Sequence, residues 1–257
     1  MSLYFFLLFF CGQTLISFAQ SDVVSSIETR VKNFEERFGI ALLYKDITLP
    51  NSITQFTAVS GEDYDHLNDY LALFVDEISK YPPGFFKARE VRAIGLVTRL
   101  FYEGKPAQGL YSSRARVMFF DVSRFINNKA LARHSIHHEL FHMMALQTPG
   151  YALNDGRWAA FNPEGFVYGP EKKSLGAANP YNPHAPDEPG FATYYAMTSV
   201  EEDKAEVFAC LMQEVNRTLM TVWAKKDQAL RQKIQAMKDF VAIYCPQMNE
   251  SYWKTLE

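Results

Sequence analysis

Two histidines and a glutamate stand at a spacing that suits metal-dependent hydrolysis. His138 and His142 are four residues apart, and Glu139 directly follows the first of them. On an α-helix, residues four apart share one face, so both imidazoles can reach the same ion. Zinc accepts imidazole nitrogens and carboxylate oxygens, and a catalytic site combines three protein ligands with one water molecule. The spacing therefore predicts one Zn²⁺ ion per chain, bound in part by His138 and His142.

Glu139 is placed to act on the water of such a site. Zinc lowers the pKa of a bound water to roughly 7, and a carboxylate beside it can take the proton as a general base. His137 lies about 100° from His138 around the helix, so it cannot easily share the same ion. His134 lies one turn earlier. We interpret His134 and His137 as supporting or surface residues.

An alternative interpretation of the motif is a helix with ordinary buried or surface histidines. Residues 123–148 contain no glycine or proline, and their apolar side chains recur at helical spacing, which predicts a largely buried helix. Buried imidazoles and carboxylates need polar partners. This context favours the metal site. The apolar residues are Ile136, Leu140, Phe141, Met144 and Ala145.

The third ligand must come from beyond the motif. A metzincin continuation would place glycine at position 145 and histidine at position 148, where this chain has Ala145 and Thr148. That class is excluded. A later helical segment offers Glu201, Glu202 and Glu206, of which Glu202 and Glu206 are four apart and share a face. One of them can bind the ion while the other holds a ligand histidine. The loop 148–191 offers further candidates, which are Asp155, His184, Asp187 and Glu188.

The segment TYYAMTSVEEDKAEVFACLM, residues 193–212, resembles the ligand-bearing helix of gluzincin peptidases. It is most similar to the catalytic domain of anthrax lethal factor and to the Pro-Pro endopeptidases, and it also resembles a bacterial group described as zinc-binding metallopeptidases. In the first two groups a tyrosine precedes the ligand glutamate by seven residues, and a second glutamate follows it by four. Tyr195, Glu202 and Glu206 occupy those places. The resemblance covers about residues 130–212.

The resemblance implies a role for each matching residue. Glu202 would be the third zinc ligand, Glu206 would support a ligand from behind, and the Tyr195 hydroxyl would support the oxyanion during catalysis. Two points stay open. Tyr194 adjoins Tyr195, so either phenol could face the site. Ser199 and Glu202 also form a capping-box pattern, in which Glu202 would only bond back to the Ser199 amide.

Composition and the N-terminus limit the class of protein. The chain has 257 residues and a formal net charge of −3, which argues against a nucleic-acid partner held by a basic surface. An apolar run at 3–10 is too short to span a bilayer. Ser17 and Ala19 suit the −3 and −1 positions of a cleavage site. We therefore predict a signal peptide at 1–19 and a secreted or periplasmic protein with no membrane span after cleavage.

A retained N-terminal membrane anchor is the alternative, because only the amino terminus supplies positive charge to this segment. In an exported chain, Cys210 and Cys245 could form one disulfide. Nothing in the sequence indicates the oligomeric state.

The elements expected around the motif come from hydrophobic periodicity. Helices are predicted at 25–38, 65–79, 127–147, 200–223 and 225–243, and strands at 40–47, 91–101 and 115–122. Residues 117–122 are the candidate for an edge strand that holds an extended substrate. The segment 148–191 contains seven prolines and six glycines among aromatic residues. Such a long loop is either a packed surface loop or a substrate-contacting one.

These observations predict an α+β, zincin-like metallopeptidase fold in one domain, residues 20–257. A small mixed sheet would pack on the motif helix within the α/β part, which ends near residue 147. The aromatic loop 148–191 and a helical part, 192–257, would follow. The predicted function is an exported zinc-dependent endopeptidase that hydrolyses peptide or protein substrates with a zinc-activated water. Two alternatives are a non-catalytic zincin-fold binding protein and a zinc hydrolase that acts on cell-wall peptides.

Overall fold

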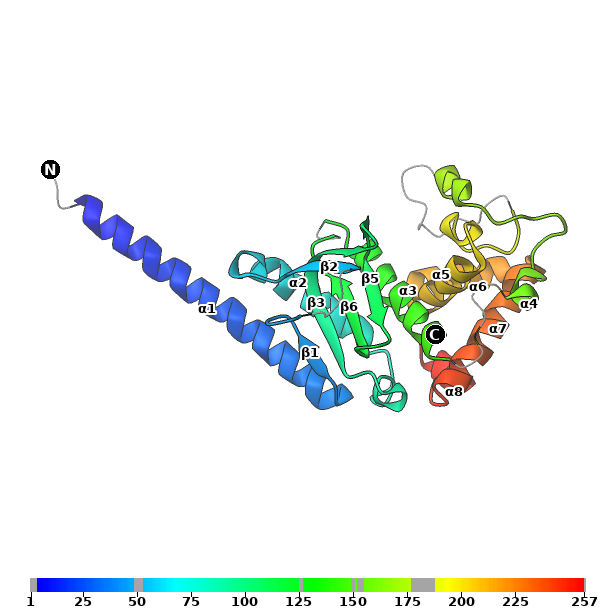
Figure 1. The fold of residues 1–257 in the computed structure, drawn as a ribbon, viewed down its shortest axis with the longest axis horizontal. Coiled ribbons are helices and arrows are strands. Elements are labelled where there is room, and N and C mark those ends of the chain that lie inside the picture. Colours follow the sequence, from blue (N-terminus) through cyan, green and yellow to red (C-terminus); the bar gives the residue numbers. More distant parts are fainter. Residues whose placement is uncertain are drawn as a thin grey trace.

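The long N-terminal helix, a twisted sheet and a helical C-terminal part follow one another along the molecule (Figure 1). The computed structural model describes residues 4–48, 53–124, 127–148, 151, 155–176 and 188–256. Helix α1 spans Tyr4–Phe38, so it begins well before the predicted helix at 25–38. It includes most of the predicted signal peptide, and removal of residues 1–19 stays a prediction. Among the described residues, no helix is both long and apolar enough to cross a membrane.

The sheet is small and mixed, as predicted. Its strands are β1 (Ala41–Leu43), β2 (Thr54–Ala58), β3 (Ala93–Tyr102), β4 (Lys105–Pro106), β5 (Gly109–Ser112) and β6 (Val117–Asp121). The order is β1-β3-β6-β5, and β2 and β4 also pair with β3. Strands β1 and β6 run parallel to β3, whereas β5 runs antiparallel to β6. The sequence predicted β1, β3 and β6 but missed the other three strands, which are short or exposed.

Strand β5 forms one edge of the sheet and β6 lies inside it, so the prediction that 117–122 form an edge strand was wrong. Strand β6 lies between β3 and β5. Met118, Phe119 and Phe120 are each at most 1% exposed, and this continuous burial is typical of an inner strand covered on both faces. Strand β5 has only four residues and begins with a glycine, so its sequence gives little strand signal. Its pairing with β6 brings the edge of the sheet beside the motif helix.

Seven further α-helices follow α1 in the described part of the chain. They are α2 (Tyr64–Ile78), α3 (Lys129–Gln147), α4 (Gly156–Ala159), α5 (Val200–Met212), α6 (Glu214–Ala224), α7 (Gln228–Tyr244) and α8 (Glu250–Thr255). The predicted helices at 65–79, 127–147 and 225–243 are confirmed within a few residues. The predicted helix at 200–223 is two helices, because Gln213 has extended backbone angles that end α5 and begin α6.

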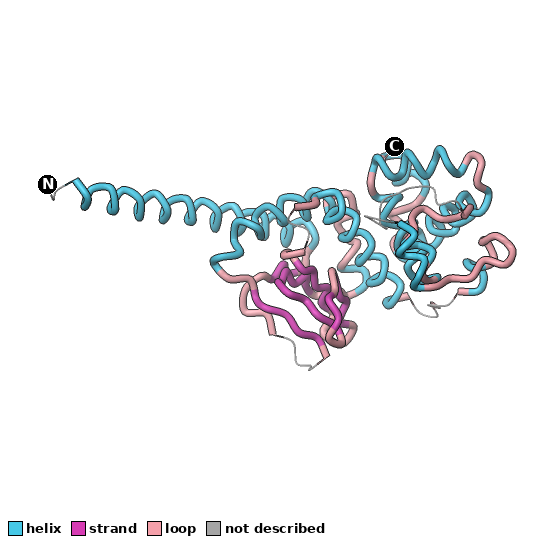
Figure 2. The backbone as a smooth tube through the Cα atoms, turned by 90° about the horizontal axis from the view of Figure 1, so that it is seen from above, coloured by secondary structure: helices cyan, strands magenta, loops and turns pink. Residues whose placement is uncertain are grey.

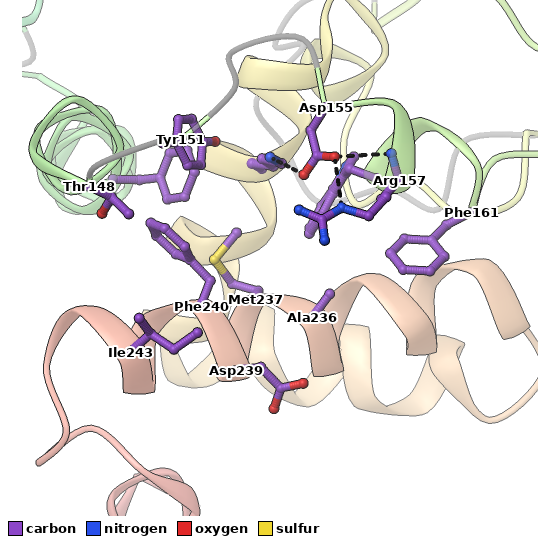
Figure 3. Close-up of a pocket in the computed structure, with 13 residues that line it drawn as sticks. Thr148, Tyr151, Asp155, Arg157, Phe161, Ala236, Met237, Asp239, Phe240 and Ile243 are labelled. Carbon is purple, nitrogen blue, oxygen red and sulfur yellow. Dashed lines mark hydrogen bonds and ion pairs between the residues drawn. The ribbon is translucent and has the colours of Figure 1, made fainter.

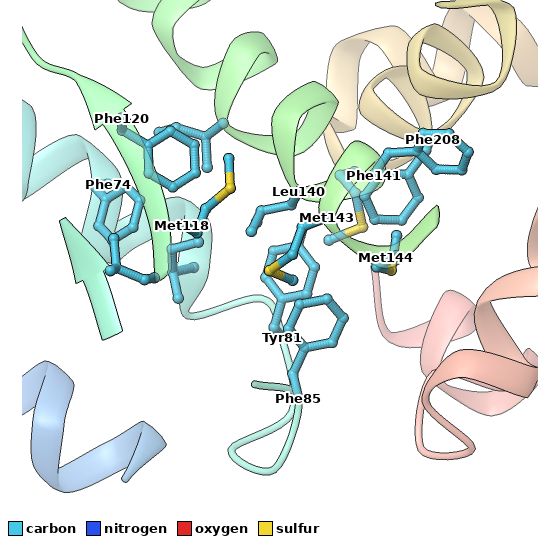
Figure 4. Close-up of a cluster of buried hydrophobic side chains, with 14 of the residues drawn as sticks. Phe74, Tyr81, Phe85, Met118, Phe120, Leu140, Phe141, Met143, Met144 and Phe208 are labelled. Atoms are coloured by element: carbon cyan, nitrogen blue, oxygen red, sulfur yellow. The ribbon is translucent and has the colours of Figure 1, made fainter. Parts of the chain in front are cut away.

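Helix α3 is buried between the sheet and the C-terminal helices. The helices gather on one side of the sheet (Figure 2). In the core, Leu140 of α3 lies on the side of β6 and its Met118, whereas Phe141 lies beside Phe208 of α5 (Figure 4). All four side chains are 0% exposed. The motif helix therefore has apolar contacts on two flanks, which fix the direction of the polar residues between them.

A buried ion pair fastens the C-terminal helices to the aromatic loop. Lys233 of α7 and Asp203 of α5 have fully buried side chains, with Nζ 2.7 Å from Oδ2. The same oxygen accepts hydrogen bonds from Trp158 Nε1 at 2.9 Å and from the Tyr168 hydroxyl at 2.7 Å. Lys233 also donates to the Gly190 carbonyl. One carboxylate thus connects two helices and two points of the loop.

Removal of one partner should therefore destabilise the fold strongly. Lys233→Met leaves the Asp203 carboxylate buried without its counter-charge, and we expect a loss of about 3–5 kcal/mol in the free energy of unfolding. Urea denaturation followed by circular dichroism measures this loss. Lys254→Met is the matched control, because Lys254 and Glu250 form an exposed pair that should contribute less than about 1 kcal/mol. Equal stabilities for the two variants would contradict the anchoring role.

Candidate metal centre

Three side chains from α3 and α5 converge at one point. His138 Nε2 lies 3.0 Å from Glu202 Oε2 and 3.0 Å from His142 Nε2. His142 Nε2 lies 3.6 Å from the same carboxylate oxygen. In a tetrahedral zinc site with ligand bonds of about 2.0–2.1 Å, ligand atoms lie roughly 3.3 Å apart. The sequence-predicted triad is therefore brought together at separations that suit one zinc ion.

The hydrogen bonds around the triad also fit a metal. Glu202 Oε2 is buried and has no hydrogen-bond partner among the described residues, although two imidazoles lie within ion-pair distance of it. A buried carboxylate oxygen left without a partner is unfavourable. A cation between the three atoms would satisfy it. His138 donates its Nδ1 proton to Glu206, so in the neutral ring the Nε2 lone pair points to the centre.

Glu206 binds the Nδ1 side of the His138 ring, opposite the Nε2 atom that faces Glu202. Its Oε1 accepts hydrogen bonds from His138 Nδ1 and His134 Nε2, both at 2.8 Å. Its Oε2 accepts one from the Thr193 hydroxyl at 2.8 Å. All of these groups are buried. Burial alone would raise the pKa of Glu206, but His134 and His138 outweigh it and lower the pKa to about 2. The carboxylate is therefore ionised when it positions His138.

Sequence reasoning found Glu206 but missed Thr193 and left His134 between two interpretations. His134 is 3% exposed and serves as a partner of Glu206. The Thr193 hydroxyl also accepts a hydrogen bond from the Ala196 amide at 3.0 Å. This bond shapes the short turn that carries Tyr195. A threonine with a backbone amide three residues on is a common turn pattern, but nothing in it points to a buried glutamate far along the chain.

The capping residue and the ligand candidate are both present at the start of α5. The Ser199 hydroxyl accepts a hydrogen bond from the Glu202 backbone amide at 3.1 Å. The Glu202 carboxylate faces the two imidazoles instead of returning to Ser199. Burial would raise the pKa of Glu202, but His138 and His142 outweigh it and hold the pKa well below its usual range.

Glu201 lies closer to the centre than its helical position suggests. Its Oε1 is 3.2 Å from His142 Nδ1, and its side chain is 33% exposed. The Glu201 carboxylate therefore lies next to His142 Nδ1, just as Glu206 lies next to His138 Nδ1. The contact is weaker, because His142 Nδ1 makes no aligned hydrogen bond within the described part of the chain.

Glu139 lies on the flank of α3 that faces the edge strand. A Cβ atom at Gly109 of β5 would stand only 2.7 Å from Glu139 Cγ, so the glycine allows the strand and the glutamate to approach. Burial raises the pKa of Glu139, while the charges of His138 and His142 lower it. The net direction is upward, which is typical of a carboxyl group that exchanges protons in an enclosed site.

Of the two adjacent tyrosines, Tyr195 lies beside the centre. Its ring centroid is 5.8 Å from that of His138. Tyr194 instead packs against a small apolar cluster made of Phe191, Ala196 and Met197.

The remaining candidates from the sequence lie elsewhere. Asp155 pairs with Lys204 at 3.0 Å, and Glu188 is exposed. His184 and Asp187 fall outside the described residues. His137 is fully buried on another flank of α3. It donates to Glu77 and accepts from the Tyr81 hydroxyl, both at 2.7 Å, and burial lowers its pKa to about 4.

Cys210 and Cys245 do not form a disulfide. Cys210 and Cys245 are both buried free thiols in the part of the molecule that the structure describes. The disulfide that an exported chain could have formed is therefore absent here.

Comparison with known proteins identifies the fold and the family of the chain. A solved structure of a "putative zinc-binding metallo-peptidase" from Bacteroides caccae ATCC 43185 has the same fold, with a TM-score of 0.55 and 16% sequence identity over 91% of both chains. No curated protein matches the chain. The model of the family described as "Putative zinc-binding metallo-peptidase" matches residues 74–252. This match confirms the resemblance to the bacterial metallopeptidase group and the predicted fold class. The chain belongs to this family of zinc-binding metallopeptidases.

Proposed function

We propose that this protein is an exported zinc-dependent endopeptidase with one zinc ion per chain, held by His138, His142 and Glu202. The observation that carries the proposal is the convergence of three metal-binding atoms from α3 and α5, of which the Glu202 oxygen has no hydrogen-bond partner among the described residues. Export after Ala19 belongs to the same proposal, and the first residue of the mature protein tests it.

The chain's own residues supply the acid–base chemistry. A bound zinc ion would act as a Lewis acid toward the scissile carbonyl and would lower the pKa of the attacking water. Glu139, one residue after His138, accepts the proton of that water and passes it to the leaving amine. Its partial burial on α3 beside β5 favours this exchange, because a raised carboxyl pKa lies closer to the working pH.

Tyr195 is proposed to stabilise the negative charge that develops on the carbonyl oxygen. Its ring lies beside the ring of the ligand His138, and its hydroxyl would donate a hydrogen bond to the oxyanion. The turn that carries it is anchored by the Thr193 hydroxyl, which also bonds to Glu206. The same carboxylate thus supports both a ligand and the tyrosine.

The substrate is proposed to bind along β5. This strand lies at the edge of the sheet, with Gly109 against Glu139. An extended peptide can add to such an edge through main-chain hydrogen bonds, which places its peptide bonds next to the general base. Main-chain recognition of this kind does not require a chain end, so it supports endopeptidase activity on peptides or proteins.

A non-catalytic binding protein with the same fold is the less supported alternative. A structural zinc site has four protein ligands and no need of a base, whereas here three ligands converge and Glu139 stands beside them. Whether the peptides come from proteins or from cell walls depends on substrate contacts outside the metal centre.

The three glutamates should differ in their effect on zinc binding. Glu202→Ala should abolish stable binding, because two imidazoles alone do not hold the ion. Glu206→Ala should weaken zinc affinity about 10- to 100-fold. Glu201→Ala should have the smallest effect, since Glu201 is partly exposed. Zinc titration against a competing chelator measures this order. Full affinity in the Glu202 variant would show that Glu202 is only a helix cap.

Glu139→Gln should separate catalysis from metal binding. The amide keeps the shape of the side chain but cannot accept the proton, so we expect turnover to fall by a factor on the order of 100 or more. Zinc content, measured by elemental analysis of the same sample, should not change. Unchanged turnover would remove Glu139 from the proposed mechanism.

The tyrosines can be tested as a matched pair. Tyr195→Phe removes only the hydroxyl, and turnover should fall by about 100-fold, as for the loss of one oxyanion donor. Tyr194→Phe is the control and should stay near the wild-type rate, because Tyr194 packs against Phe191 and Met197. The comparison uses kcat on one peptide substrate. A larger loss in the Tyr194 variant would reverse the assignment.

A further inference from the structure

A pocket of about 430 Å³ lies beside the metal centre, between the aromatic loop and α7. In Figure 3, Tyr151, Asp155, Arg157 and Phe161 face it from the loop side, and residues of α7 such as Phe240 face it from the opposite side. Phe141 of α3 and Lys204 of α5 complete its lining. This volume is of the size of known small-ligand pockets.

Five of the thirteen residues that line the pocket are aromatic. Tyr151 and Phe240 have ring centroids 5.4 Å apart, and each ring also packs against Phe141. Trp158 and Phe161 form a second pair, with centroids 6.2 Å apart. Phe141 and Trp158 are buried, whereas Ile243 at the rim is 72% exposed. An exposed isoleucine beside aromatic walls favours an apolar occupant, because burial of this surface is favourable.

The charged groups of the pocket already have partners. Lys204 Nζ lies 3.0 Å from Asp155 Oδ2, and Arg157 Nε lies 3.8 Å from Asp155 Oδ1. Asp239 accepts a hydrogen bond from Gln235 at 2.9 Å. Two acidic and two basic residues line the pocket, so their charges balance. A charged occupant would find no counter-charge in excess, and this again favours a neutral apolar group.

The pocket adjoins the metal centre through Phe141 and Lys204, and none of the proposed metal ligands lines it. The rings of Phe141 and His142 have centroids 6.0 Å apart. Lys204 lies three residues after Glu201 on α5, so the two share a helix face, and Glu201 lies 3.2 Å from His142. Phe141 and Glu139 lie on opposite flanks of α3, about 200° apart. The metal centre is thus between the pocket and strand β5.

We propose that this pocket binds a bulky apolar side chain, aromatic or branched aliphatic, of the peptide substrate. The proposal rests on the proposed peptidase function and names the substrate class for that site. A peptide that lies along β5 with one bond at the metal centre would cross the ligand face of α3. Successive residues of an extended chain advance about 3.3 Å, so the side chain in the pocket would come from a residue a few positions from the cleaved bond.

Binding to an inactive form tests the pocket without requiring cleavage. The protein is zinc-loaded Glu139→Gln, and the probes are five pentapeptide amides made of alanine with Phe, Leu, Ala, Lys or Glu at the central position. Trp158 in the wall reports binding through its fluorescence. It is one of three tryptophans, so Trp158→Phe identifies its signal. We expect the Phe and Leu peptides to bind about 10-fold or more tightly than the other three.

Variants that change the volume of the pocket complete the test. Ala236→Phe adds a ring from α7 into the pocket and should abolish the preference for Phe and Leu peptides. Gln232→Phe adds the same ring at an exposed position of the same helix and should leave the preference for Phe and Leu peptides unchanged. Phe240→Ala enlarges the pocket and should shift the preference to a tryptophan peptide. Thermal melts establish that each variant is folded before titration.

Any of three results would overturn the proposal. The first is that a charged peptide binds most tightly, and the second is that the Ala236→Phe variant keeps its preference for the Phe and Leu peptides. The third is that no peptide binds. Turnover of the same peptides by the wild-type protein is measured separately. Selective binding without any cleavage would refute the peptidase function and would leave the pocket assignment intact. Cleavage without a side-chain preference would refute the pocket assignment and would leave the peptidase function intact.

Discussion

The packing of α3 against α5 is the constraint on which the site depends. Neither helix carries a complete metal centre, because α3 supplies the imidazoles and α5 the carboxylates. Phe141 and Phe208 set the distance between the helices through an apolar contact. The hydrogen bond from His138 to Glu206 then fixes their rotation relative to each other. A hydrogen bond is directional whereas apolar contact is not, so both are required to bring three ligand atoms to one point.

The Glu206 carboxylate connects the proposed metal centre to the loop. Glu206 has two oxygens, and they serve different elements, since Oε1 bonds to histidines of α3 and Oε2 bonds to Thr193. Thr193 in turn accepts from the Ala196 amide and so fixes the turn that carries Tyr195. Because every donor is buried, a shift of any one would leave an unsatisfied polar group. This makes the position of Tyr195 depend on the helix pair and not on the loop alone.

The sequence predicted the parts of the site that rest on local spacing. His138, Glu139 and His142 follow from helical periodicity, and Glu202 and Glu206 from the same spacing together with the family resemblance. Residues whose role depends on distant contacts could not be predicted in this way. Thr193 and Gly109 act through partners on other elements, and the order of strands placed β5 at the edge where the sequence favoured 117–122. Pairing order depends on long-range packing, which no local pattern records.

The first turns of α5 show why composition alone gave an incomplete picture of this site. The run EEDKAE, residues 201–206, resembles a solvated helix surface by its charge. In the structure each charged residue faces a partner outside α5. Glu201 and Glu202 face the two imidazoles, Asp203 faces Lys233 and the loop, Lys204 faces Asp155, and Glu206 faces His134 and His138. Burial of so many charges is tolerated only with matched partners on every side. A helix of this kind therefore has its place in the fold set by its charges, and the proposed metal centre uses Glu202 Oε2, which has no hydrogen-bond partner among the described residues.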